Sequence, residues 1–156
     1  MKNEHDETLK KVQSALMQMH RYLMNSLKTD RENQMGRSIP ATEWFHLMVS
    51  DPEFKWLRTA SGLMSDIDAL MDNYTVSENE LKLIRQELES LFLVPNENPN
   101  EFQSIYSEIA KRNSDVMLYH AHLKQMIQSL PSGGSPVADT SEVRKAWHQK
   151  PQKHHS

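Results

Sequence analysis

Histidines are the residues of this sequence most able to bind a metal ion or a small ligand. His20 and His120 flank apolar residues on two expected helices, and His46 lies on a shorter one. Helical bundles build metal sites from inward-facing side chains of this type. However, no His-x-x-x-His motif occurs, and His120 and His122 lie roughly 200° apart around a helix. We therefore favour His20 and His120 as buried polar residues, and keep a bundle that binds a metal or small ligand through inward-facing histidines as the alternative.

Carboxylates on one expected helix are the second candidate for chemistry, because paired carboxylates can act as general acid and base. Asp66, Asp68 and Asp72 lie within two turns of each other, and Arg58 lies on the same segment. No Gly-rich phosphate loop or nucleophile motif accompanies them. Ion pairs of this kind are common without a function. We expect Arg58 and Asp68 to be buried polar residues, and we expect no catalytic residue, no enzyme activity and no cofactor.

Tryptophans are the candidates for partner binding. Trp44 and Trp56 lie on either side of Asp51-Pro52, and Trp147 lies in a basic segment near the C-terminus. Tryptophan is enriched at interaction hot spots, although Trp44 and Trp56 can equally form one end of the core. The segment around Trp147 can form a short helix on binding a partner, with Val143 and Trp147 on one face. We predict these three tryptophans as possible partner-binding residues.

The composition limits the class of the protein. Apolar residues recur at spacings of three and four, and glycine is scarce at 4 of 156 residues, so an all-α fold is expected. The absence of cysteine excludes disulfides, thiol catalysis and Cys-ligated zinc. The net charge of −3 gives no reason to propose nucleic-acid binding, and no apolar run is long enough for a membrane span. We expect a cytoplasmic protein that binds neither nucleic acid nor membrane.

Four long helices and one short helix are expected to position these side chains in a helical bundle. The clearest signal is the capping-box spacing of Ser77 and Glu80 at the start of the third long helix. A wholly polar stretch at 111–115 predicts a kink or a short break in the last helix. The predicted helices cover residues 6–28, 41–50, 51–72, 77–93 and 100–130.

The composition changes at Pro131. Residues 131–156 contain four Lys or Arg and two acids, so this tail carries about +2 and residues 1–130 about −5, which sum to −3. The tail has little apolar content and several helix-breaking residues. We therefore predict a helical bundle domain at 1–130 and a disordered basic tail at 131–156.

The central segment, from Trp44 to Asp72, resembles a family of small all-helical bacterial proteins whose function is uncharacterised. The shared pattern is Asp-Pro-x-Phe-x-Trp-Leu-Arg, followed by Ile-Asp-x-Leu. The matching residues are Asp51, Pro52, Phe54, Trp56, Leu57, Arg58, Ile67, Asp68 and Leu70. The resemblance covers the middle of the chain well, the first and last helices loosely and the tail not at all. It implies a bacterial, cytoplasmic protein and implies no activity.

These observations together favour a non-catalytic protein-interaction module, with another protein as the partner. A well-signalled bundle without a catalytic motif, a methionine content of 10 residues, and Trp147 in a basic tail support this hypothesis. The oligomeric state is not predicted. The alternative remains the metal-binding or ligand-binding bundle described above.

Overall fold

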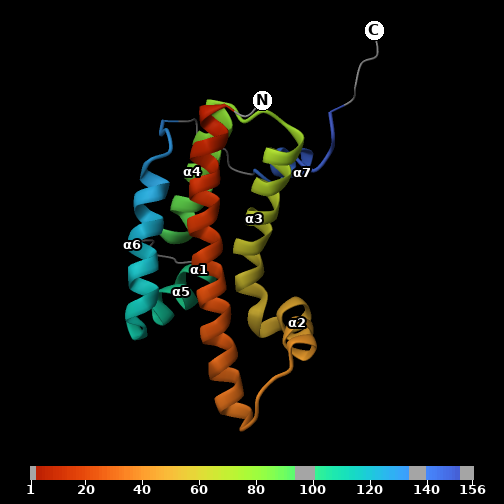
Figure 1. The fold of residues 1–156 in the computed structure, drawn as a ribbon, viewed down its shortest axis with the longest axis vertical. Coiled ribbons are helices and arrows are strands. Elements are labelled where there is room, and N and C mark those ends of the chain that lie inside the picture. The colour runs from red at the N-terminus through yellow and green to blue at the C-terminus, as the bar shows by residue number, and fades with distance from the viewer. Residues whose placement is uncertain (1–2, 94–100, 134–139, 152–156) are drawn as a thin grey trace.

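The computed structural model describes residues 3–93, 101–133 and 140–151. Over these residues the chain is all-helical, as predicted, and its helices pack as a bundle (Figure 1). The described part has more helices than the four long and one short that were expected. In chain order the elements are α1 (Glu4–Met35), α2 (Ala41–Ser50), the 3-10 turn η1 (Pro52–Phe54), α3 (Lys55–Asn73), α4 (Glu78–Phe92), α5 (Glu101–Arg112), α6 (Ser114–Gln128) and α7 (Ser141–Ala146).

The first helix, α1, is the axis of the bundle (Figure 1). It packs most extensively against α6 and next against α3, and both of these helices run antiparallel to it. Its apolar residues recur in steps of three and four, so they form one stripe that faces the neighbouring helices. One core receives fully buried side chains from α1, α3, α4 and α6, among them Leu16, Met19, Leu63, Ile67, Ile84, Leu88 and Leu123.

The first helix is longer than predicted, because it continues to Met35 through a polar stretch that was expected to be a loop. Residues 29–35 include Glu, Gln, Arg and Met, which are good helix formers. The helix ends at Gly36, whose φ of 71° is a left-handed conformation that glycine adopts readily. The Gly36 N–H donates to the Glu32 carbonyl at 2.9 Å, which closes the last turn.

Two predicted helix starts are confirmed by their capping bonds. The Asp51 carboxylate accepts a hydrogen bond from the Glu53 N–H at 2.9 Å, and Pro52 begins a 3-10 turn that leads into α3. At the start of α4, the Ser77 N–H donates to Glu80 Oε1 at 2.9 Å, and the Glu80 N–H donates to Ser77 Oγ at 3.4 Å. These reciprocal bonds are the capping box that the sequence predicted.

The expected break in the last long helix lies at Asn113, between α5 and α6. The Asn113 side chain accepts hydrogen bonds from the N–H groups of Asp115 at 3.1 Å and Val116 at 3.4 Å, so it caps α6. Residues 94–100, which include the predicted start of this helix and the connection before it, lie outside the described residues. The predicted helix at 100–130 is therefore two helices, and this division accounts for part of the larger helix number.

The C-terminal tail differs most from the prediction. Residues 141–146 form α7, and Trp147 at its end is only 5% exposed. The prediction of a disordered tail is therefore wrong for residues 140–151, because this segment buries an aromatic side chain and pairs its charges with the bundle. The rest of the predicted tail beyond Gly133, at 134–139 and 152–156, lies outside the described residues.

Candidate functional site

The C-terminal segment, residues 140–151, lies against α3 and α4, and its helix α7 is beside the upper end of α3 in Figure 1. Trp147 belongs to the same buried apolar cluster as the bundle core. Four residues of the bundle contact this segment through polar groups, and we call them the docking surface: Asp66 and Asn73 of α3, Tyr74, and Glu87 of α4. One aromatic anchor inside a polar frame is the usual anatomy of a protein-binding site.

Asp66 is the central carboxylate of the docking surface. Its Oδ2 accepts a hydrogen bond from Arg144 Nε at 2.6 Å, and its Oδ1 lies 2.6 Å from His148 Nε2. The side chains of Asp66 and Arg144 are 18% and 20% exposed, so this pair is less screened by water than an ordinary surface ion pair. One carboxylate therefore holds two side chains that lie one helical turn apart on the C-terminal segment.

Glu87 makes the matching contacts from α4. Its Oε1 accepts a hydrogen bond from the Thr140 hydroxyl, and its Oε2 lies 3.7 Å from Arg144 Nη1. Arg144 thus reaches one carboxylate on α3 and one on α4. These two helices follow each other in sequence, but they are not among the closely packed pairs of the described helices. The C-terminal segment therefore joins two helices that contact each other little.

The backbone at the end of α7 is also held. Asn73 Nδ2 donates to the Trp147 carbonyl at 2.9 Å, and Tyr74 Oη donates to the Gln149 carbonyl at 2.6 Å. The Trp147 carbonyl, at the C-cap of α7, has no partner within the helix, and the Gln149 carbonyl lies just beyond it, so these two side chains supply hydrogen bonds that would otherwise come from water. Asn73 and Tyr74 close α3, which fixes their position relative to Asp66 on the same helix.

This contact face was not predicted, although the spacing of its residues in the sequence was a signal for it. Thr140, Arg144, Trp147 and His148 lie at positions i, i+4, i+7 and i+8, which is one face of a helix. The expected pairing of Val143 with Trp147 is not the contact face, since Val143 is 42% exposed. The available signal was this spacing of polar residues, together with the opposite charges of the tail and the body.

Trp44 and Trp56, the other predicted partner-binding residues, are 8% and 3% exposed. The Trp44 ring packs edge-to-face on Phe54 with centroids 5.3 Å apart, and Trp56 lies 5.5 Å from Phe102. Both indoles therefore pack within the molecule in this conformation, as Trp147 does. Whether any of the three meets a partner stays a prediction.

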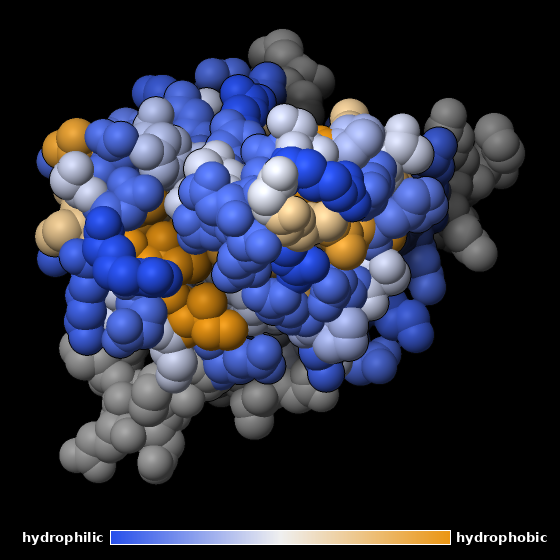
Figure 2. Space-filling model, turned by 90° about the horizontal axis from the view of Figure 1, so that it is seen from below, coloured by the Kyte–Doolittle hydropathy of each residue, from blue (hydrophilic) through white to orange (hydrophobic). Residues whose placement is uncertain are grey.

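A pocket of about 480 Å³ lies at the lower end of the bundle, between α1, η1 and α5. Figure 2 views this end and shows apolar surface set between polar side chains. The pocket is lined by apolar side chains that include Phe54 and Ile105, and by Arg31 and Arg112. Arg31 is already engaged, because it pairs with Glu53 and lies 5.2 Å from the Phe54 ring centroid. The charges of this pocket are mixed, so they do not specify one ligand.

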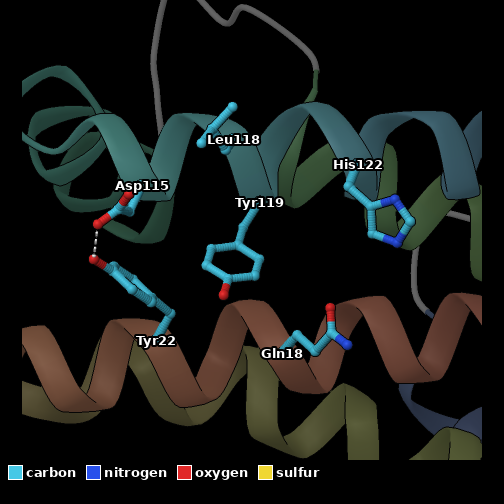
Figure 3. Close-up of a pocket in the computed structure, with 6 residues that line it drawn as sticks. All are labelled: Gln18, Tyr22, Asp115, Leu118, Tyr119 and His122. Atoms are coloured by element: carbon cyan, nitrogen blue, oxygen red, sulfur yellow. Dashed lines mark hydrogen bonds between the residues drawn. The ribbon is translucent and has the colours of Figure 1, made fainter.

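A second open pocket of about 480 Å³ lies between α1 and α6 (Figure 3). Tyr22 Oη donates to Asp115 Oδ2 at 2.7 Å, and the Tyr119 ring is 5.1 Å from the Tyr22 ring. The hydrogen bond to the carboxylate, followed by desolvation, raises the pKa of the Tyr22 phenol. Leu118, at the rim, is 70% exposed. The Tyr22–Asp115 hydrogen bond links α1 to α6, and it gives the Tyr22 hydroxyl and the Asp115 carboxylate a partner within the protein.

His20 and His120, both predicted as buried polar residues, are of intermediate exposure in the structure. His120 Nδ1 lies 2.8 Å from the hydroxyl of Tyr106, so the two side chains share a hydrogen bond. Burial lowers the pKa of His20, and burial followed by the charge of Lys124 lowers the pKa of His120. Burial also raises the pKa of Tyr106 strongly.

Arg58 and Asp68 have different positions. Arg58 is partly buried, and its Nη1 donates to the carbonyls of Met48 at 3.0 Å and Asp51 at 3.2 Å. Arg58 thereby fastens the end of α2 to α3. Asp68 is exposed, contrary to expectation. Its hydrogen-bond partner Gln13, which donates to Asp68 Oδ1 at 2.9 Å, is buried and only 4% exposed.

The histidines do not form a metal site in the described part of the chain. His46 is exposed on α2, and Glu43, three residues earlier, pairs with Arg37 at 2.8 Å. No group of three His, Asp or Glu side chains within residues 3–93, 101–133 and 140–151 could hold a metal ion. His20, His46 and His120 therefore do not meet at one point.

Comparisons with known proteins provide no further assignment. No model of a protein family matches the chain, and no curated protein or solved structure matches it either. The resemblance of the central segment to a bacterial family thus stays a prediction. Among the described helices, none combines the length and the apolar character that crossing a bilayer requires. The case for function depends on the geometry of the docking surface.

Proposed function

We propose that this protein is a non-catalytic protein-interaction module, and that its binding surface is the docking surface on α3 and α4. The observation that carries this proposal is the contact between that surface and residues 140–151. In the state described here the chain's own C-terminal segment occupies the surface. A partner protein would bind by presenting a similar segment in its place.

The length of α7 supports this proposal. A helix of six residues is too short to be stable in water on its own. Its helical form therefore depends on the bundle, which supplies the burial of Trp147 and the bonds to the carbonyls at the helix end. A surface that orders a short helix in this way has the property that defines helix-binding modules.

The kinds of residue at the contact support it as well. Tryptophan and arginine dominate the binding energy of many interfaces, and here Trp147 is the buried anchor while Arg144 pairs with two carboxylates. The remaining contacts are polar and lie at the edge of the segment. This division into a central anchor and a polar rim is typical of reversible protein contacts.

The test is binding of a peptide in trans. A fluorescein-labelled peptide of residues 140–151 is titrated with full-length protein carrying Trp147→Ala, and anisotropy is measured. The substitution weakens the protein's own segment and leaves the docking surface intact, so the peptide should bind. Full-length Val143→Ala is the matched control, because Val143 is exposed and the segment stays docked. Since a tethered segment competes at an effective concentration of about millimolar, the control should bind at least about tenfold more weakly.

Far-UV circular dichroism of both variants shows whether the bundle is folded. A second variant, Arg144→Ala, releases the segment without removing the tryptophan and should also bind the peptide. If folded Trp147→Ala and Arg144→Ala proteins both fail to bind the labelled peptide, the docking surface is only an internal contact and the proposed function is wrong.

A further inference from the structure

We infer that the docking surface selects a partner segment by charge, and that its ligand class is a short basic helix with an aromatic anchor. This inference rests on the proposed function and specifies the partner. The segment carries arginine at one position, tryptophan three residues later and a histidine directly after it, as Arg144, Trp147 and His148 do here. The chain's own C-terminal segment is then a built-in competitor for partners of this class.

The case for a cation at the arginine position comes from the two carboxylates. Asp66 and Glu87 come from different helices and both face Arg144, and their side chains are only 18% and 25% exposed. A segment with a neutral or acidic residue there would leave two partly buried carboxylates close together without the arginine that pairs with both, which is unfavourable. The surface therefore discriminates against such segments as well as attracting basic ones.

The geometry also favours arginine over lysine. Arg144 uses Nε for Asp66 and Nη1 for Glu87, so two edges of one planar group contact two helices. A lysine ammonium is a compact charge and does not present two separated donors in this fixed arrangement. We therefore expect a lysine at this position to be accepted with lower affinity.

The other contacts set the class of ligand without adding to the charge selection. Asn73 and Tyr74 donate hydrogen bonds to backbone carbonyls, and every residue has such a carbonyl whatever its side chain. These two bonds therefore position the end of the helix without selecting particular side chains. Trp147 supplies the buried apolar surface. The negative charge of residues 1–130, about −5, favours the approach of basic segments over a longer range.

Reversing single charges on the peptide and on the protein tests the inference. All measurements use the full-length Trp147→Ala protein and the labelled 140–151 peptide. An Arg144→Glu peptide should bind about tenfold or more weakly, as expected for loss of a partly desolvated charge pair. A Lys145→Glu peptide has the same charge change one residue away, at an exposed position. Its affinity should fall only about two- to threefold.

The protein side has a matched pair of variants too. Adding Asp66→Lys to the Trp147→Ala protein should lower the affinity for the unmodified peptide and raise the affinity for the Arg144→Glu peptide. The coupling in a double-mutant cycle should be about fivefold or more. Asp72→Lys is the control, because Asp72 is an exposed carboxylate on the same helix. It should show coupling of less than about twofold.

The outcomes separate this inference from the proposed function. If the unmodified peptide binds but Arg144→Glu and Lys145→Glu peptides bind equally, selection by charge is wrong while the interaction function stands. If Asp66→Lys shows no more coupling than Asp72→Lys, Asp66 is not the selecting residue and the inference is overturned. If no peptide binds, the proposed function itself fails.

Discussion

The bundle core and the C-terminal segment are held by different forces. Around α1 the buried side chains are mainly apolar, and Leu16 and Leu63 are each 1% exposed. The C-terminal segment has one buried anchor, Trp147, and several partly exposed charged contacts around it. Salt screens partly exposed ion pairs, whereas it does not screen apolar burial, which many salts strengthen. The core is thus suited to permanent structure, and the segment to a contact that can open.

The largest expected effect comes from opening a cavity in the core. Leu16→Ala should lower the free energy of unfolding by about 2–5 kcal/mol, because the fully buried side chain leaves a void between α1 and its neighbours. Urea unfolding followed by circular dichroism measures the change. Leu118→Ala, at a 70% exposed position, is the control and should change stability by less than about 0.5 kcal/mol. Equal losses in the two variants would contradict the described core.

Removing the anchor of the C-terminal segment should have a smaller and more local effect. Trp147→Ala should lower the stability of the segment's docking by about 1–3 kcal/mol, with little change in the unfolding of the bundle. Hydrogen exchange measures this directly, because the amides of Arg144 and Trp147, which bond within residues 140–147, should lose protection. Exchange in α1 should stay slow. Loss of protection throughout the chain would show that the segment is part of the cooperative core.

A helix cap tests a local interaction that involves neither the core interior nor the C-terminal segment. Ser77→Ala removes the Ser77 side chain from the capping box of α4 and should cost about 1 kcal/mol in unfolding free energy. Ser65→Ala, at an exposed position inside α3, is the comparison and should be close to neutral. Urea unfolding distinguishes the two. A neutral Ser77→Ala would mean that water replaces the cap without loss.

The smallest expected effect is a decline in core stability below pH 6.5. The pKa values of His20 and His120 are lowered from 6.5 in the folded state. A base with a depressed folded pKa contributes fully above its unfolded pKa, and the contribution is lost as pH falls through 6.5 toward the folded value. Unfolding measured at pH 7.5, 6.5 and 5.5 should show this decline. It should be reduced in His120→Gln and unchanged in His122→Gln, whose side chain is exposed.

Salt sharpens the comparison between the two regions. Raising the ionic strength should increase amide exchange in residues 141–147 and leave the protected amides of α1 unchanged, because only the segment depends on partly exposed charges. The measurement needs no substitution. If both regions respond alike, the docking of the segment is mainly apolar and Trp147 alone holds it.

Much of the local structure follows from the sequence. The bounds of α2, the capping box of Ser77 and Glu80, and the break near Asn113 were predicted because each depends on residues within one or two turns. The buried stripe of α1 was predicted for the same reason, since helical spacing alone places its leucines on one face. His20 and His120 flank these stripes and were predicted as buried polar residues, but the structure gives both an intermediate exposure.

The docking of the C-terminal segment was decided by tertiary structure. Residues 140–151 have too little apolar content to predict order, and their stabilising partners, Asp66 and Glu87, lie 78 and 57 residues before Arg144 in the sequence. Helical spacing specifies which side chains share a face, but it does not specify which distant surface that face will meet. The sequence by itself determined the apolar stripes and most of the helix positions, but not the extension of α1 to Met35 or the presence of α7. Only the packed bundle brought two carboxylates from α3 and α4 around one arginine.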